Sequence, residues 1–226
     1  DDAAEFDGLT QSVVVEDGEA YDLARFTVAA WVRFDEHRQP QIIANRGERG
    51  QAFTLYLYKD RIRMLVEHEA GKYAYATAAP PDVGRWTHLS GSYDGKKIRL
   101  YVNGKLVDEA AAPGRMPRRA GPLSIAAQAP GSNVLAGALA DVRIYGEALK
   151  AEQARAVAAG EAIDGREPVL QLSAAELRKQ RRADQPVADD GGHPLFVKRG
   201  ELPTADGFRG IWYSNQPQDD EYKFKY

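Results

Sequence analysis

The stretch that decides the fold is GRWTHLSGSYDGKKIRLYVNGKLV, residues Gly84 to Val107. It contains two tight-turn dipeptides, Asp94-Gly95 and Asn103-Gly104, which are typical of type I′ turns because both central residues of such a turn need positive φ. Between them, apolar and polar residues alternate over Lys96 to Val102, and a period of two predicts a half-buried strand. The stretch therefore predicts two successive antiparallel hairpins.

The same period of two extends over the flanking sequence. Residues 25–34, RFTVAAWVRF, alternate in this way, and residues 51–68, QAFTLYLYKDRIRMLVEH, predict a hairpin that turns near Lys59-Asp60. Later strands are expected at Leu123–Ala127 and Leu139–Tyr145, followed by a short helix over Lys150–Ala159 that stops at Gly160. Many short strands with closely spaced turns favour an all-β antiparallel sandwich over alternating βαβ units.

Composition excludes several classes of function. The 226 residues are 43% hydrophobic and 28% charged, as in ordinary globular proteins. The formal charge is only -3 and basic residues form no long run, so nucleic acid is not an expected partner. Cysteine is absent, which excludes disulfides, zinc-thiolate sites and thiol nucleophiles. No apolar run approaches the ~18 residues of a membrane helix, so no membrane span is expected.

Three segments carry a family resemblance: FTVAAWVRF, the Gly84–Val107 stretch, and GALADVRIYGEALKAEQ. In this order they resemble the laminin-G-like members of the concanavalin A-like jelly-roll family, in which a W-x-H strand, a YDG turn, a Y-V-N-G-K turn and a closing D-V-R-I-Y strand recur. The resemblance implies a sandwich of two antiparallel sheets, one of them concave, over residues 1–160. Short C-terminal helices and a partly extended tail complete the expected fold class.

The sequence changes character after residue 160. Ser173-Ala-Ala-Glu176 has the form of a capping box, so residues 161–183 are expected to form a helical connector. Residues 184–226 are expected to hold a linker and then GFRGIWYSNQPQDDEYKFKY, which resembles the truncated start of a BNR-repeat, sialidase-like propeller. This resemblance implies a parent among secreted glycoside hydrolases or polysaccharide lyases, and fold analogy does not choose between them. A secreted, periplasmic or cell-surface location is expected, with an export signal already removed.

Tyrosine and arginine mark a candidate glycan site. Sugar rings stack their apolar faces on aromatic side chains, and their hydroxyls take hydrogen bonds from polar groups. In three neighbouring predicted strands, tyrosines and arginines lie opposite the apolar set, and together they would suit an acidic glycan on the concave sheet. The alternative is that they are exposed residues of a solvated sheet, placed there by β-propensity alone. The candidate carbohydrate-binding residues are Tyr56, Tyr58, Arg61, Arg63, Tyr73 and Tyr75.

The laminin-G-like resemblance also implies a structural calcium ion. Many members hold Ca²⁺ near an F-D-G segment and the D-V-R-I-Y strand, here represented by Asp7 and Asp141. Oxygen ligands of this kind are those that Ca²⁺ requires. The family often has two acids before V-R-I-Y, whereas this chain has Ala140-Asp141, so one carboxylate is missing. The alternative is that Asp7 caps a turn and Asp141 is a surface strand residue.

No catalytic residue is predicted. His88 has no serine or aspartate partner at a fixed spacing, and we interpret Trp86 and His88 as residues of the sheet. Glu67, Glu69, Asp108 and Glu109 are interpreted as solvated edge or turn residues rather than a glycosidase pair. The leading hypothesis is a non-catalytic carbohydrate-binding module that tethers a downstream catalytic domain to a polysaccharide. The alternatives are a structural or protein-interaction domain that braces the propeller, and a glycan lyase or hydrolase in its own right.

Overall fold

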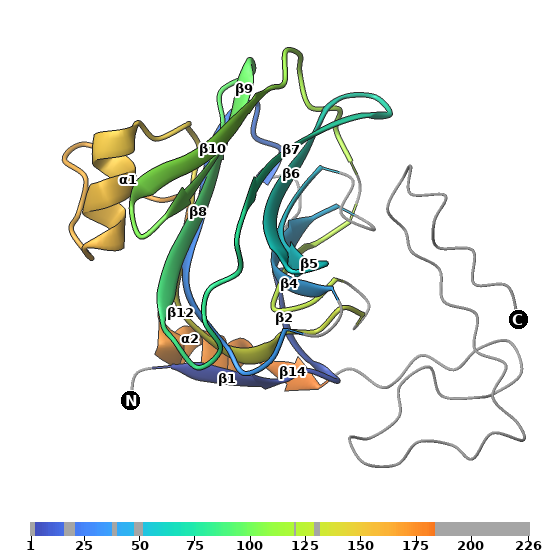
Figure 1. Cartoon of the computed structure of the whole chain (residues 1–226), viewed down its shortest axis with the longest axis vertical. Helices are drawn as coiled ribbons and strands as arrows, with labels where there is room; N and C mark the ends of the chain where they lie inside the picture. The colour runs from blue at the N-terminus through green and yellow to red at the C-terminus, as the bar shows by residue number, and fades with distance from the viewer. Residues whose placement is uncertain are drawn as a thin grey trace, which may run out of the picture. The chain divides into compact units, whose positions relative to one another are not determined.

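The computed structural model describes residues 3–15, 21–37, 40–47, 52–119, 121–128 and 132–183. They form two seven-stranded antiparallel sheets packed face to face, with two short helices (Figure 1). This confirms the predicted all-β jelly-roll sandwich. The linker and the propeller-like segment predicted at residues 184–226 lie outside the described residues.

Sheet 1 is the sheet against which helix α1 (Ala151–Ala158) packs. Its strands are β1 (Ala4–Asp7), β3 (Phe26–Phe34), β8 (Thr87–Tyr93), β9 (Lys97–Val102), β10 (Lys105–Ala111), β12 (Ala136–Tyr145) and β13 (Leu170–Leu172). Their order is β1-β12-β3-β8-β9-β10, and β13 also pairs with β12. The hairpins predicted from the Gly84–Val107 stretch are therefore β8-β9 and β9-β10, at one side of this sheet.

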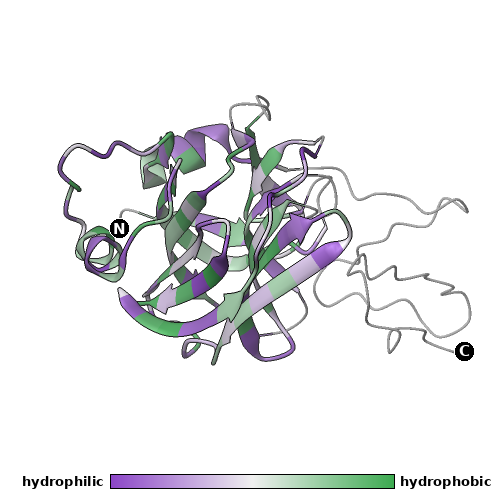
Figure 2. Ribbon diagram, turned by 90° about the horizontal axis from the view of Figure 1, so that it is seen from above, coloured by the Kyte–Doolittle hydropathy of each residue, from purple (hydrophilic) through white to green (hydrophobic). Residues whose placement is uncertain are grey.

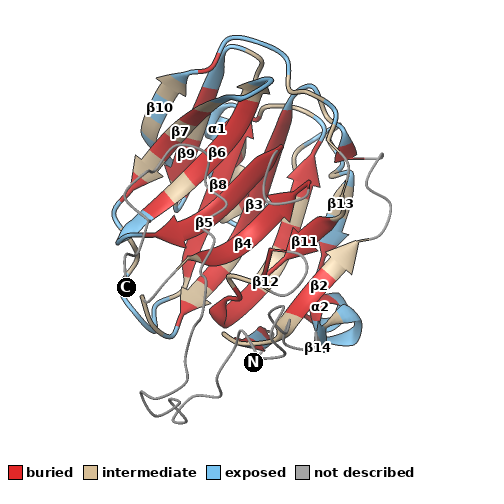
Figure 3. Cartoon of the chain, turned by 90° about the vertical axis from the view of Figure 1, so that its right-hand side faces the viewer, coloured by how far each residue is buried: buried red, intermediate tan, exposed pale blue. Residues whose placement is uncertain are grey.

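Sheet 2 carries the predicted glycan site. Its strands are β2 (Gln11–Val15), β4 (Gln41–Arg46), β5 (Phe53–Tyr58), β6 (Arg61–Glu69), β7 (Lys72–Ala78), β11 (Leu123–Ile125) and β14 (Arg182–Ala183). Their order is β14-β2-β11-β4-β5-β6-β7. Figure 3 looks onto this sheet and shows its central strands as buried and its loops as exposed.

The main core fills the space between the two sheets and is built from apolar residues of both. Figure 2 shows hydrophobic and hydrophilic residues following one another along the strands. Phe26 of sheet 1 stacks on Phe53 of sheet 2 with ring centroids 4.4 Å apart. Gly91 has no side chain because Met64 fills the space opposite: a Cβ on Gly91 would lie 2.4 Å from the Met64 sulfur. Close packing of this kind leaves little room for substitution in the core.

The turn predicted at Asn103-Gly104 has the expected type I′ backbone, because both residues have positive φ. The hairpin predicted near Lys59-Asp60 turns at these residues, and both of them also have positive φ. The Asp94-Gly95 turn differs from the prediction because only Gly95 has positive φ. Asp94 instead accepts the backbone N–H groups of Lys96 and Lys97 through its carboxylate, and this side-chain bond shapes the turn in place of the type I′ backbone.

Helix α1 (Ala151–Ala158) lies on the outer face of sheet 1, on the side away from sheet 2 (Figure 1). A second small core forms beneath it from Ala29, Tyr145, Leu149 and Val157. The helix approaches the β9-β10 turn closely, since a Cβ on Gly104 would lie 2.7 Å from the Cα of Arg155.

The region predicted as a helical connector belongs to the sandwich. It contains β13, helix α2 (Ala174–Gln180) and β14, which add to sheet 1, the core and sheet 2 respectively. The predicted capping box is present, because the Ser173 hydroxyl accepts the Glu176 N–H and the Glu176 carboxylate accepts the Ser173 N–H. The sandwich therefore extends past residue 160 to the last described residue, Ala183.

The edge strands of the two sheets meet along one side of the sandwich. The Thr77 N–H of β7, which points away from β6, donates to the Asp108 carboxylate of β10 over 2.7 Å. Strand β10 is irregular at the same place, with a register shift between Leu106 and Asp108. A side chain of one sheet thus satisfies a backbone group of the other.

Candidate functional site

All six predicted glycan-binding residues lie on the outer face of sheet 2. Tyr56 pairs with Arg63, and Tyr58 with Arg61, across β5 and β6. Tyr75 pairs with Leu65, and Tyr73 with Glu67, across β6 and β7. Residues paired in register point to the same side of a sheet, so three neighbouring strands present these side chains together.

The six side chains differ in accessibility. Tyr56 is 0% exposed and Tyr58 is 4% exposed, although both face away from the main core. Arg63, Tyr73 and Tyr75 are half-buried, and Arg61 is exposed. The alternative of four exposed tyrosines does not describe this face. The part that a ligand can reach is formed by β6 and β7.

Arg63 is held between aromatic rings. Its guanidinium carbon lies 4.7 Å from the centroid of the Tyr58 ring and 5.9 Å from that of the Tyr75 ring. Its Nε is buried and has no hydrogen-bond partner among the described residues. Stacking on aromatic faces restricts the guanidinium plane, so its hydrogen-bonding groups are positioned in advance of binding. Beside it, Arg61 donates to the Thr77 hydroxyl over 3.0 Å.

Glu67 forms the polar end of this surface. Its carboxylate is 0% exposed and accepts two hydrogen bonds from Arg119, one of them from Nε over 2.7 Å. The Gly71 N–H donates to it as well. The expectation that Glu67 is a solvated edge residue is therefore wrong. Burial and the neighbouring Glu67 carboxylate raise the pKa of Tyr73, so its phenol stays protonated and serves as a hydrogen-bond donor rather than a base.

Sequence reasoning missed a polar row on the same face. Ser124, Asn45, Thr54, Leu65 and Tyr75 lie side by side across β11, β4, β5, β6 and β7. Thr54 donates to the Asn45 side-chain oxygen over 3.0 Å, and Asn45 donates to the Gly47 carbonyl. Counting by twos along QIIANR and FTLYLY could have placed Asn45 and Thr54 on this face.

His88 lies on the outer face of sheet 1, not in the glycan surface. Its ring is 1% exposed, meets the edge of the Trp31 ring at 5.4 Å, and has a buried Nδ1 without a hydrogen-bond partner in the described part of the chain. Burial lowers the pKa of His88 from 6.5 to about 4, with Asp141 opposing and Arg143 adding to this effect. His88 is therefore a neutral packing residue at neutral pH.

A family model for the concanavalin A-like lectin/glucanases superfamily matches residues 7–155. This chain belongs to that superfamily. The match spans the β1-to-α1 part of the sandwich, including both sheets, and confirms the resemblance drawn from the sequence. No similar sequence was found among curated proteins.

Solved structures of this lectin/glucanase fold resemble the chain at low identity. A Bacteroides ovatus protein proposed to bind carbohydrate has 17% identity and a TM-score of 0.60, with 76% of this chain and 50% of that one covered. A heptameric SAP-like pentraxin of Limulus polyphemus has 19% identity and a TM-score of 0.53, with 74% and 78% covered. The receptor-binding domain of a botulinum neurotoxin C/D mosaic has 12% identity and a TM-score of 0.53, with 71% and 46% covered. The chain thus spans half the length of the Bacteroides protein, and at these identities the likeness shows the fold alone.

The two aspartates predicted to hold calcium do not fit a shared site in this lectin-like fold. Asp7 pairs with Ala136, five residues before Asp141 on β12, which separates them by about 16 Å along the strand. Asp7 accepts the N–H groups of Leu9, Thr10 and Gln11, as a turn cap does. Burial raises its pKa, but these bonds outweigh burial and leave the pKa below its ordinary value.

Asp141 is likewise engaged by protein donors. Arg143 lies 2.7 Å from its carboxylate, and Gln171 donates to it over 3.0 Å. A neighbouring guanidinium disfavours a divalent cation. Among the described residues, no group of three or more histidine or acidic side chains is placed to hold a metal. Calcium therefore stays a prediction from resemblance, and the donors around Asp7 and Asp141 do not support it at these positions.

Proposed function

We propose that this chain is a carbohydrate-binding module that takes a glycan, including an acidic one, on the β6–β7 part of sheet 2. The observation that carries the proposal is the Arg63 guanidinium stacked between the Tyr58 and Tyr75 rings on a sheet face that a ligand can reach. Tyr75 offers an aromatic face to a sugar ring, and Arg61 offers hydrogen-bond donors. The Tyr73 proton is held by Glu67, which leaves the Tyr73 oxygen as an acceptor for a sugar hydroxyl. A carboxylate or sulfate on the glycan would pair with the arginines.

Two solved structures support this proposal. The Bacteroides ovatus protein is itself proposed to bind carbohydrate. The binding domain of botulinum neurotoxin DC has been solved in complex with SialylT, at 10% identity and a TM-score of 0.53, covering 66% of this chain and 39% of that one. We extend glycan binding to this chain because its own outer face has the required side chains.

For the larger protein to which this module would belong, the proposal is the same as the expectation from the sequence. We propose that the module belongs to a secreted, periplasmic or cell-surface polysaccharide-degrading enzyme and tethers a downstream catalytic domain to its substrate. Tethering raises the effective concentration of substrate. Loss of the module should therefore reduce activity on polymers more than on short soluble substrates, and equal losses on both would count against this context. No helix in the described ranges is long and apolar enough to cross a membrane.

Affinity electrophoresis tests the binding proposal directly. The purified chain should be retarded by at least one of a panel of neutral and acidic polysaccharides. Tyr75→Ala or Arg63→Ala should weaken the retardation about tenfold, as the loss of a ring-stacking or charge-assisted contact does. Arg85→Ala is the matched control, because Arg85 is 72% exposed and lies in the turn that leads into β8 of sheet 1. Thermal unfolding of each variant separates lost binding from lost folding.

The second candidate is a structural or protein-interaction domain. Tyr56, Tyr58 and Leu65 are buried although they face away from the main core, and burial of this kind is typical of a covered sheet face. Under this second candidate function no glycan retards the chain. Tyr56→Ala lowers the thermal unfolding temperature in either case, because the ring is fully buried. Retardation by a glycan is therefore the result that distinguishes a ligand-binding face from a packing face.

A further inference from the structure

The loop that connects β10 with β11 closes one end of the sandwich and is rich in arginine. We call residues Pro113–Arg119, PGRMPRR, the basic loop. Its backbone is fixed at several points: the Tyr93 hydroxyl donates to the Gly114 carbonyl over 2.8 Å, and the His68 ring nitrogen lies 3.0 Å from the Pro113 carbonyl. Met116 packs against the main core. The loop is therefore held rigidly enough to present its side chains in a defined place.

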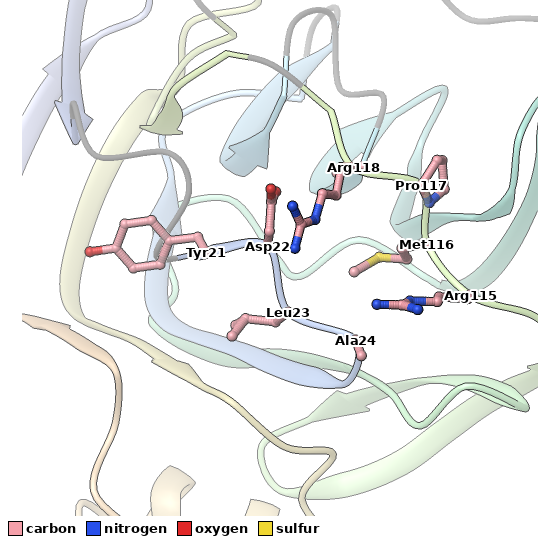
Figure 4. Close-up of a pocket in the computed structure, with 9 residues that line it drawn as sticks. Tyr21, Asp22, Leu23, Ala24, Arg115, Met116, Pro117 and Arg118 are labelled. Atoms are coloured by element: carbon pink, nitrogen blue, oxygen red, sulfur yellow. The ribbon is translucent and has the colours of Figure 1, made fainter.

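Two of its arginines extend toward the segment Tyr21–Ala24 across a shallow depression (Figure 4). Arg115 and Arg118 are both exposed, and neither has a carboxylate partner among the residues the structure describes. The depression has a volume of about 50 Å³, which is room for one or two waters or a small ionic group rather than a sugar ring. Within the described part of the chain, the guanidinium groups of Arg115 and Arg118 form no ion pair that the fold depends on.

Among the described residues that line this depression, arginines outnumber carboxylates. The Asp22 carboxylate at its wall is already engaged by Arg46, a buried side chain whose Nη2 lies 2.7 Å from the Asp22 oxygen. The other two charged side chains of the described lining, Arg115 and Arg118, are both cationic, so this part of the surface carries two positive charges beyond the Arg46–Asp22 pair. An excess of this kind attracts an anion to the rim of the sandwich.

The basic loop is continuous with the proposed glycan surface. Arg119, the residue after Arg118, is bound to Glu67 on the outer face of sheet 2, and Glu67 is the register partner of Tyr73. Glu67 lies four residues along β6 from Arg63, which is about 13 Å of strand. A glycan that lies along β6 and extends past Tyr73 would therefore leave the sheet at the basic loop.

We propose that the basic loop is an anion subsite, in which Arg115 and Arg118 hold a carboxylate or sulfate group of an acidic glycan whose sugar rings lie on the β6–β7 surface. The inference rests on the proposed function and makes it more specific. Arginine forks match the planar geometry of carboxylate and the oxygens of sulfate. Because the two arginines lie at an exposed rim, their contribution falls as salt screens them.

The subsite makes binding depend on the length of the glycan. A short oligosaccharide that covers only Tyr73 and Tyr75 does not reach Arg115 and Arg118, and it gains nothing from their charge. A longer acidic chain reaches both parts and binds more tightly. We therefore expect affinity to increase with chain length for acidic glycans more steeply than for neutral ones.

The test is affinity electrophoresis at low salt against three polymers: a polyuronate, a sulfated glycan and a neutral glucan. Arg115→Gln/Arg118→Gln is compared with Arg85→Gln/Lys105→Gln, which removes the same charge from exposed positions elsewhere. We expect the loop variant to weaken binding of an acidic polymer about five- to tenfold and to leave neutral-glucan binding unchanged, as the loss of two exposed charge contacts predicts. The control pair should change binding less than about twofold. The polyuronate and sulfated arms show which acidic group the subsite prefers.

The outcomes test the anion subsite separately from the proposed carbohydrate-binding function. Retardation that requires Tyr75 but is equally reduced by both double variants, or by neither, overturns the anion subsite and leaves the carbohydrate-binding module standing. Retardation of the wild-type chain by none of the polymers overturns both. Unchanged thermal unfolding of the two double variants confirms that the comparison reports binding.

Discussion

His88 and Glu67 are both almost fully buried, but of the two only Glu67 forms an ion pair with a described residue. The Glu67 carboxylate accepts hydrogen bonds from Arg119 and from the Gly71 N–H, and these offset its burial. His88 has the Trp31 ring edge beside it and a buried Nδ1 with no partner in the described part of the chain. A buried charge without compensation is costly, so mutation of the partners of these two residues has different consequences.

His88 makes stability dependent on pH. Its pKa is about 4 in the folded chain and 6.5 in the unfolded one, so the unfolded chain binds the proton more readily between these values. The His88 contribution is fully present above pH 6.5 and is lost as the pH falls toward 4, by about 3 kcal/mol at most. Urea unfolding at a series of pH values should show this loss, and His88→Gln should show a shallower slope over the same range.

Equal slopes for the wild type and His88→Gln would contradict the assignment. If the variant does not fold, the imidazole resonances of the wild type give the answer instead. A midpoint near 6.5 for His88 would show that its ring is not buried as described.

Breaking the Glu67–Arg119 pair should destabilise the fold. Arg119→Ala leaves the Glu67 carboxylate buried without its main partner, and we expect a cost of about 3 kcal/mol, at the lower end for such pairs because Arg119 is 31% exposed. Arg118→Ala, one residue earlier, removes a guanidinium with no ion-pair partner among the described residues and should cost less than about 0.5 kcal/mol. Chemical denaturation measures both, and similar costs for the two would contradict a structural role for the pair.

At the scale of elements, the attachment of α1 to sheet 1 depends on one small residue. The helix passes so close to the β9-β10 turn that Gly104 has no room for a side chain. Gly84 provides a matched comparison: its φ is +78°, close to the +74° of Gly104, but a Cβ there would meet nothing within 4 Å. Comparing substitutions at Gly104 and Gly84 therefore distinguishes the cost of backbone strain from the cost of a steric clash with helix α1.

Gly104→Ala should therefore be more destabilising than Gly84→Ala. Both substitutions place alanine in the left-handed region, at a cost of about 1 to 2 kcal/mol. Only Gly104→Ala also pushes a methyl group into the backbone of α1, and we expect it to cost at least about 1 kcal/mol more, as overpacking does. Thermal unfolding of the two variants tests this. Equal shifts would show that α1 moves away from the turn without penalty.

The elements themselves could be predicted from the sequence because side-chain direction in a strand is a local property. Counting by twos placed Tyr56 and Arg63 on one face, and the Asn103-Gly104 dipeptide specified its turn. For Asp94-Gly95 the sequence predicted the position of the turn but not its type. The Asp94 carboxylate accepts two backbone N–H groups, and these bonds shape the turn in place of a type I′ backbone. The strands β13 and β14 were missed because each is short and is stabilised by pairing with a distant strand.

For the candidate site, the sequence could predict the direction in which each side chain points but not how exposed that side chain is. The sequence indicates which side chains face away from the core, but not which of them are covered. Burial of Glu67 depends on Arg119, which is 52 residues away in the chain. The pairing of Asp7 and Asp141 came from family resemblance and not from local pattern, and the register places them apart.

At the scale of the whole molecule, residues 1–185 form the first of the chain's two units, and this first unit is compact. The described residues of the main core all lie in the first unit, between Ala4 and Leu177. A chain that ends at Gln185 should therefore fold by itself and unfold in one cooperative transition, because it keeps all of these core residues. Its thermal unfolding temperature should lie within a few degrees of that of the full chain.

A much lower unfolding temperature, or loss of cooperativity, would contradict this and would favour the structural reading of the outer face of sheet 2. The same truncated chain can be placed in the affinity electrophoresis assay. Unchanged retardation would show that the glycan surface is complete within the first unit.

The contact between Thr77 and Asp108 has a consequence for solubility. The open edge of a sheet is a template on which another chain can add a strand, and such addition leads to fibrils. Here the Asp108 carboxylate accepts the hydrogen bond of the Thr77 N–H at the edge of sheet 2. The register shift in β10 makes the edge of sheet 1 irregular at the same place. Molecules crowded together along a polymer would then meet at an edge that is already capped, which protects them from aggregating by strand addition on that side.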